Sequence, residues 1–244
     1  MHELWFTAFL NHNLAGPANA ILNAVGQPAA DASRPWTNYM AMEILILLVL
    51  LAVPLLIRSS LSVTRPGTLQ QVFEVIYEFL RGQAEDIVGH GGHKYVYMFG
   101  TFFLFILFAN LLGAVPTFES PTMHPAVPLG LALISFFYYN GAGMRAQGPV
   151  GYLKHFAGPV MFLAPFMFPL EIISHCVRPV SLTIRLFANM FAGEEVTLKF
   201  LSIVPVGIPV IFMALHVFVA LLQAFIFTVL SMVYVSVAVA HEEH

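Results

Sequence analysis

The chain has 244 residues, of which 59% are hydrophobic and only 9% are charged, and its formal net charge is −3. A soluble domain carries about 25% charged residues, so this composition excludes a soluble catalytic domain and indicates one integral membrane domain over residues 1–244. The few cations form no basic arm, which argues against nucleic acid as a partner. Cys176 is the only cysteine, which excludes an internal disulfide and a cysteine-based metal cluster.

Residues 1–41 are expected to form an external segment, in which Trp5, Phe6 and Phe9 are typical of a helix at the membrane interface. Residues 42–157 are expected to hold peripheral spans and a cytoplasmic amphipathic segment. Apolar runs predict crossing helices at Met42–Ile57, Tyr95–Val115 and, shorter, Val127–Tyr139. Between the first two, apolar residues with helical spacing among polar ones predict an amphipathic surface helix: Leu69, Phe73, Ile76, Leu80 and Ile87.

Residues 158–240 are expected to form a hairpin of two long helices. From Pro159 to about Leu201 the chain stays apolar for about 43 residues, which as a helix would be roughly twice as long as the bilayer core. This length predicts a strongly tilted or bent helix, then a turn at residues 202–209, then a second long helix ending near Ala240. The fold class is therefore an all-α polytopic membrane protein with about five membrane-crossing helices plus amphipathic interfacial helices, the last two crossing helices forming a long tilted hairpin.

Cations in the connections predict the orientation of the chain. Arg34 and Lys199 are expected on one side of the membrane. The positive-inside rule places a larger group, after the first and third spans, in the cytoplasm: Arg58, Arg65, Arg81, Lys94, Arg145 and Lys154. The N-terminus is then outside, and five crossings leave the C-terminus inside.

Arg185 lies in the apolar first helix of the hairpin, where a charge costs about 3 kcal/mol on insertion scales and the guanidinium cannot lose its proton. Ser181 and Asn189 share its face, because they lie four residues away on either side. Two interpretations are open: an ion pair with Glu171 or Glu194, and a functional cation that faces a water-filled path or another subunit. Along an unbroken helix these carboxylates lie roughly 21 and roughly 13 Å away, so neither is a simple intrahelical partner.

The second helix of the hairpin supplies facing polar groups. If the turn is centred near Val206, positions whose numbers sum to about 411 face each other. This register sets His216 level with Glu194 or Glu195 and places Gln223 near the depth of Arg185. Because His216 and Gln223 are seven residues apart, they share one face. Two polar pockets divided by a fixed positive charge would form an interrupted channel.

Three stretches carry a family resemblance: "PVSLTIRLFANMFAGE", "LHVFVALLQAFIFTVLSMVYVSVA" and the closing "EEH". They resemble the a subunit of bacterial F-type ATP synthases, the stator of the membrane ion motor. The resemblance implies a subunit that is not catalytic alone and provides two offset half channels, which load and unload protons on the carboxylates of the c-subunit ring. It further implies contact with the b-subunit peripheral stalk, other ATP synthase subunits and lipid, in the bacterial plasma (inner) membrane.

The same resemblance implies roles for individual residues. Arg185 stands at the essential arginine that faces the ring carboxylate. The outer half channel and its junction are expected to use Glu194, His216, Asn189 and Gln223. The cytoplasmic half channel is expected to use Glu171, Ser181 and His175, although His175 also fits a histidine that is simply satisfied at a helix interface. Asn110 and Glu119 are further candidates for the channel.

Two other classes of membrane protein compete with this interpretation. A haem-binding electron carrier needs paired histidines on facing helices, but the register sets His175 and His216 far apart. An ion-coupled secondary transporter would show internal repeats, and none is visible. No cofactor and no metal are expected, and both "HGGH" at 90–93 and "HEEH" at 241–244 are interpreted as polar segments.

Overall fold

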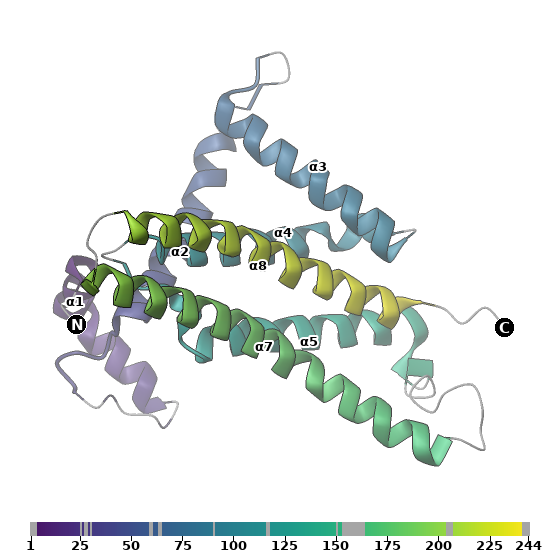
Figure 1. Ribbon diagram of the computed structural model, residues 1–244. Helices are drawn as coiled ribbons and strands as arrows, with labels where there is room; N and C mark the ends of the chain where they lie inside the picture. The colour runs from purple at the N-terminus through teal and green to yellow at the C-terminus, as the bar shows by residue number, and fades with distance from the viewer. Residues whose placement is uncertain are drawn as a thin grey trace.

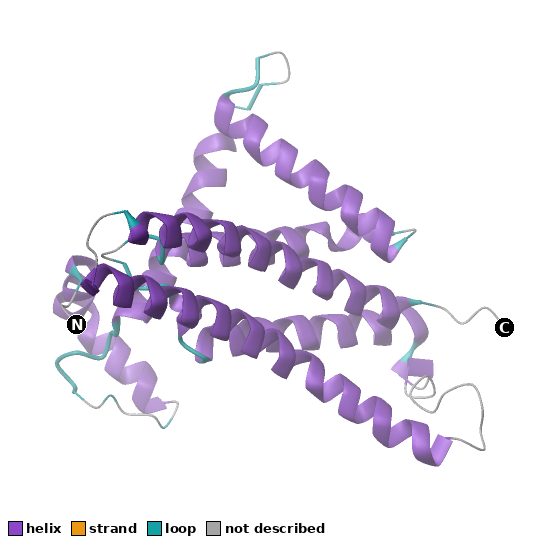
Figure 2. Ribbon diagram, viewed as in Figure 1, coloured by secondary structure: helices purple, strands orange, loops and turns teal. Residues whose placement is uncertain are grey.

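The computed structural model describes residues 4–24, 26, 29, 31–58, 61–62, 65–89, 91–115, 118–149, 151–152, 164–203 and 207–240. Within these ranges the regular elements are α-helices and two short 3-10 helices, without a strand (Figure 2). The all-α class predicted from the sequence is therefore confirmed. His90, Lys154, Val206 and residues 241–244, all used above, lie outside the described residues.

Two long antiparallel helices form the predicted hairpin, and Figure 1 shows them side by side. The first, α7, spans Ala164–Ile203 and has 40 residues, which corresponds to about 60 Å. It continues through Pro169 and Pro179. The second, α8, spans Ile208–Val239 and follows Gly207, whose positive φ of 91° favours glycine.

The apolar surfaces of α4 and α5 meet those of the two hairpin helices in the core. Helix α4 (Val96–Leu112) packs along α8, while α5 (Ala126–Gln147) packs against both α7 and α8. Phe102 of α4 meets Phe227 of α8 with ring centroids 5.4 Å apart. Such edge-to-face aromatic pairs add to the apolar burial that fixes α4 against the hairpin.

Helix α5 is longer than the Val127–Tyr139 span predicted from its apolar run. It continues through small residues to Gln147, because its last turns pack closely on α8. Gln147 donates hydrogen bonds to the carbonyls of Ala238 and Ala240, and the Ser135 and Ser231 hydroxyls lie 3.0 Å apart. The apolar run alone therefore underestimated the length of this helix.

The N-terminal helices lie at the side of the bundle. Helix α1 (Trp5–Ala24) buries Phe6 and Leu10 against α2 (Asn38–Arg58), while Trp5 and Phe9 remain exposed. Helix α3 (Thr68–Val88) is the predicted amphipathic helix. Its first turns stand away from the hairpin in Figure 1, and its last turns approach α8, where the Ser236 hydroxyl donates to the carbonyl of Ile87 at 2.7 Å.

Three helical segments of the described chain are long and apolar enough to cross a membrane: Asn38–Leu56, Gly92–Leu112 and Val210–Val239. The other two helices predicted to cross, α5 and α7, carry more polar residues but lie alongside these segments in the same bundle (Figure 1). Polar side chains in a membrane bundle commonly face its interior and mark ion pathways.

Gly143 tests the close packing of α5 on α8. A Cβ atom there would lie 2.5 Å from a ring carbon of Tyr152 and 2.9 Å from the carbonyl oxygen of Ala238. We expect Gly143→Ala to lower the free energy of unfolding by about 1–3 kcal/mol through overpacking. Gly130→Ala, on the same helix with nothing within 4 Å, is the control. Thermal unfolding of the two variants in detergent is the measurement, and equal midpoints would contradict the packing described.

Candidate functional site

Arg185 lies in the middle part of α7 and is half-buried. It makes no hydrogen bond, ion pair or ring contact with any other residue that the structure describes. The ion pair with Glu171 or Glu194, one of the two interpretations of the sequence, is therefore not formed. Glu171 contacts Arg178 instead, and the Oε2 atom of Glu194 is buried with no hydrogen-bond partner among the described residues.

Glu194 and His216 line one cavity of about 50 Å³, at the turn-proximal end of the hairpin beside the end of α4. The His216 ring is buried between two glycines, since a Cβ on Gly193 would approach its Nδ1 to 3.0 Å and one on Gly113 its Nε2 to 3.3 Å. Within the described chain, His216 Nε2 also lacks a hydrogen-bond partner. The cavity is large enough for water, so a carboxylate and an imidazole share one site that water can enter.

A buried polar network lies next to Gly113 and joins the end of α4 to the segment between α4 and α5. The Thr122 hydroxyl donates to the Asn110 Oδ1 atom at 2.6 Å, and the Ser120 hydroxyl lies 2.8 Å from that of Thr122. All three side chains are fully buried. A Cβ on Gly113 would touch both Ser120 and His216, which shows that the network adjoins the Glu194–His216 cavity.

The network leads toward Glu119, the residue before Ser120. Glu119 Oε1 lies 3.1 Å from His124 Nε2, and the His124 ring packs on that of Tyr39 with centroids 4.3 Å apart. Asn110 and Glu119 were candidates from the sequence. The hydroxyl groups and His124 were missed, because a short irregular segment has no periodicity that would place its side chains.

Asn189 and Gln223 join the two helices of the hairpin one turn from Arg185. Asn189 Nδ2 donates to Gln223 Oε1 at 2.8 Å. Their numbers sum to 412, so the predicted register of about 411 is confirmed. Gln223 is buried, and its Nε2 has no hydrogen-bond partner within the described ranges.

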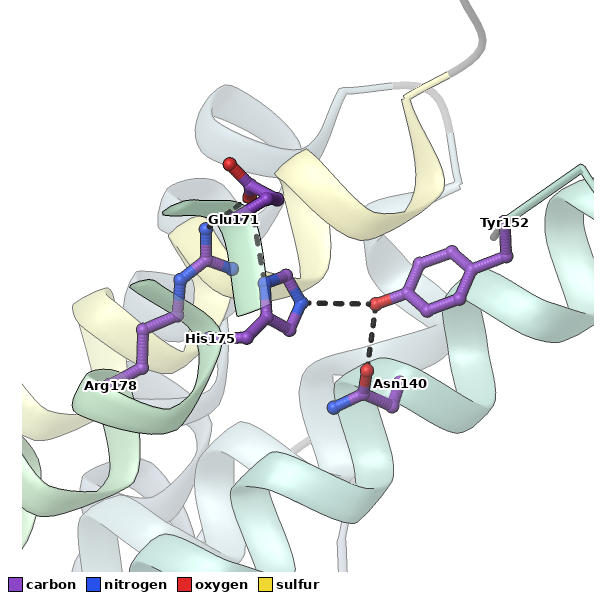
Figure 3. Close-up of polar contacts among 5 residues, drawn as sticks. All are labelled: Asn140, Tyr152, Glu171, His175 and Arg178. Carbon is purple, nitrogen blue, oxygen red and sulfur yellow. Dashed lines mark hydrogen bonds and ion pairs between the residues drawn. The ribbon is translucent and has the colours of Figure 1, made fainter. Parts of the chain in front are cut away.

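A second polar cluster lies on the other side of Arg185, toward the start of α7. Figure 3 shows its side chains. Glu171 Oε1 lies 3.5 Å from His175 Nδ1 and 3.7 Å from Arg178. On its other side, His175 Nε2 lies 3.3 Å from the Tyr152 hydroxyl, which donates to Asn140 Oδ1 at 2.8 Å. His175 is thus buried with polar neighbours on both ring nitrogens.

Arg178 belongs to this cluster and was missed in the sequence. Its guanidinium lies over the rings of Tyr139 and Tyr234, 5.8 and 5.2 Å from their centroids. A signal was present, since Arg178 is seven residues from both Glu171 and Arg185 and therefore shares their face. Tyr152 and Asn140 had no such signal, because they come from segments whose register against α7 the sequence does not fix.

Ser181 is half-buried, one turn from Arg185, and makes no side-chain hydrogen bond within the described chain. The structure places it between the Glu171 cluster and the arginine. Among the described residues, no group of three or more His, Cys, Asp or Glu side chains is arranged to hold a metal ion.

Apolar helices surround an arginine that has no partner among the described residues, with a polar cluster on each side of it. This arrangement defines a helical membrane protein with polar groups in its interior. Residues 39–236 match the family model described as ATP synthase A chain. A protein from Solibacter usitatus (strain Ellin6076) named ATP synthase subunit a is 53% identical over 232 residues, which are 95% of this chain and 99% of that protein. The namesake from Koribacter versatilis (strain Ellin345) is 50% identical over 240 residues, 98% of each chain.

The chain therefore belongs to the ATP synthase A chain family. It is a stator proton-channel subunit of an F-type ATP synthase and is not catalytic alone. The family membership rules out the haem-binding carrier and the secondary transporter considered from the sequence.

A substitution at Gly113 tests whether the position of the His216 ring matters for proton transport. We expect Gly113→Ala to reduce ATP-driven proton pumping severalfold, because the new methyl group would lie 2.8 Å from Ser120 Cβ and 3.3 Å from His216 Nε2 and would displace the ring. Pumping is measured in membrane vesicles that contain the assembled complex. Gly130→Ala is again the control and should pump normally. Undiminished pumping by Gly113→Ala would show that the position of His216 is not critical.

Proposed function

We propose that the two polar clusters are the half channels of the stator and that Arg185 is the fixed cation between them. One observation carries this proposal: Arg185 has no partner among the described residues, although it lies half-buried between the two clusters. A membrane arginine stays charged at a cost of about 3 kcal/mol or more, so it requires a partner. The partner that fits is a carboxylate from another chain, carried by the ring of c subunits.

The exposed face of the hairpin supports a ring partner. On both sides of Arg185, α7 and α8 expose large apolar side chains at helical spacing, which suits contact with an apolar helical ring. These exposed residues are Val177, Val180, Ile184, Leu215, Phe218 and Leu222.

The outer half channel would run from Glu119 through the Asn110 network to Glu194 and His216, and end at Asn189 with Gln223. Histidine and glutamate can each take up and release a proton, and hydroxyl and amide groups can hold connecting water. The shared cavity allows water to bridge the two titratable groups. Ions would thus reach the arginine without crossing the apolar core.

The cytoplasmic half channel would run from Ser181 past the cluster of Glu171, His175 and Arg178. Arg178 neutralises part of the charge of Glu171, and Tyr152 fixes the His175 ring. Polar side chains therefore continue from the arginine toward the start of α7. His175 is proposed as a member of this path rather than only a packed interface residue, because both of its ring nitrogens face polar groups.

The fixed charge of Arg185 would couple proton transfer to movement of the ring. A ring carboxylate beside Arg185 is favoured in its ionised form and gives its proton to one half channel. An ionised carboxylate is too costly to bury in lipid, so it must take a proton from the other half channel before it moves on. Arg185 also repels protons between the two paths, and each charge that crosses releases about 2.3 kcal/mol per 100 mV.

We further propose that the chain lies in the bacterial plasma membrane with its N-terminus outside and its C-terminus in the cytoplasm. The cation-rich connections between predicted spans support this orientation. The relatives named above are bacterial, which supports that membrane. The b-subunit peripheral stalk is proposed as a further partner.

Arg185→Ala in the assembled complex tests the proposal. We expect ATP-driven proton pumping to be lost while the subunit is still assembled, with ATP hydrolysis measured in parallel. Arg185→Lys should also fail, because lysine can lose its proton when desolvated and lacks the planar fork that matches a carboxylate. Arg65→Ala, on an exposed residue between α2 and α3, is the control. Normal proton pumping by the Arg185→Ala variant would contradict the proposal.

A further inference from the structure

A second cationic site lies away from the proton path, at the end of the bundle where α4 begins and α5 ends. It is a cavity of about 690 Å³ between the 3-10 helix η1 (Gly92–Tyr95) and the last turns of α5. Two of its walls are cationic, namely Lys94 of η1 and Arg145 of α5. The other lining residues are aromatic or small: Tyr95, Phe137, Tyr138, Gly141, Ala142 and Ala146.

Neither cation is neutralised within the described chain. Lys94 and Arg145 make no side-chain hydrogen bond or ion pair with another described residue, and no carboxylate is among the described residues that line the cavity. Two unpaired cations that face one cavity repel each other unless an anion lies between them. The cavity therefore fits an anionic ligand, and its volume is within the range of small-molecule sites.

The positions of the two cations indicate how deep in the membrane the ligand lies. Lys94 comes just before α4, which lies in an apolar segment long enough to cross the membrane, and Arg145 lies in the last turn of α5. Between them, the Tyr95 ring meets that of Tyr138 edge to face at 6.2 Å. Cations and tyrosines together at a helix end are typical of the membrane–water interface, where phosphate head groups lie.

An apolar stripe leads from the cavity along α5. Leu129, Leu133 and Phe137 recur every four residues on one face of the helix, beside Ile134, and all four are exposed. The stripe begins at the cavity, which Phe137 lines, and extends away from Arg145 for about 12 Å. A soluble anion would not contact this apolar stripe, whereas the acyl chain of a lipid would cover it.

We propose that this cavity binds the head group of an anionic phospholipid. The phosphate lies between Lys94 and Arg145, and an acyl chain follows Phe137, Leu133 and Leu129. Basic pockets at the ends of membrane helices recognise lipids such as cardiolipin by this chemistry. The site involves none of the residues assigned to the proton path. The lipid proposal therefore does not depend on the proposed half channels.

Photolabelling of the assembled complex tests the site. The purified complex is reconstituted in phosphatidylcholine nanodiscs that contain a trace of phosphatidylglycerol with a photoreactive acyl chain. Labelled peptides are then mapped by mass spectrometry. We expect label on the α5 peptide that includes Leu129 to Phe137, and a loss of about tenfold or more in K94Q/R145Q, because each cation near the membrane surface contributes severalfold to anionic-lipid binding.

A control variant and two competing probes distinguish lipid binding from the alternatives. R58Q/R65Q removes the same charge from the end of α2 and the segment after it, outside the cavity, and should keep the label. Equal labelling by a photoreactive phosphatidylcholine would show that acyl packing alone is recognised, and would overturn the proposal. Displacement of the label by millimolar inorganic phosphate would identify a free-phosphate site and would also overturn it. Unchanged labelling in K94Q/R145Q, with assembly and ATP hydrolysis intact in every variant, would do the same.

Discussion

The uncompensated charge of Arg185 is the constraint on which the rest of the structure depends. The guanidinium remains charged in an apolar helical bundle, and the described chain provides it with neither a carboxylate nor a hydrogen-bond acceptor. Glu171 contacts Arg178, and Glu194 shares a cavity with His216. Within the described residues the hairpin is therefore electrostatically incomplete at Arg185, which suits a subunit that works against a moving partner rather than a self-contained channel.

The architecture keeps Arg185 from pairing with the carboxylates of its own helix. Helix α7 is long enough to carry Glu171 and Glu194 on the same element as the arginine, yet at roughly 21 and 13 Å from it. Arg178 contacts Glu171 at 3.7 Å, so the carboxylate that lies on the arginine's face already has a cation beside it. Packing of α7 on α8 and α5 fixes these positions, and the Asn189–Gln223 hydrogen bond fixes the register next to the arginine.

Much of this arrangement was accessible from the sequence, because helix length, period and a short turn are strong constraints. Those three features predicted the hairpin, its register and a position of His216 level with Glu194 or Glu195. The partners of Glu171 and His175 were less accessible. Arg178 shares their helix and could have been found by its seven-residue spacing. Tyr152 reaches His175 from outside α7, through tertiary packing that periodicity does not encode.

Access to the two clusters from opposite sides of the membrane is the central claim, and cysteine accessibility measures it most directly. In a Cys176→Ser background, Ser181→Cys and Thr197→Cys place thiols on opposite sides of Arg185, the second on the wall of the Glu194–His216 cavity. Inhibition of proton pumping by a membrane-impermeant thiol reagent is compared in inside-out and right-side-out vesicles. The account predicts that Ser181→Cys reacts from the cytoplasmic side and Thr197→Cys from the outer side; reaction of both from one side would contradict it.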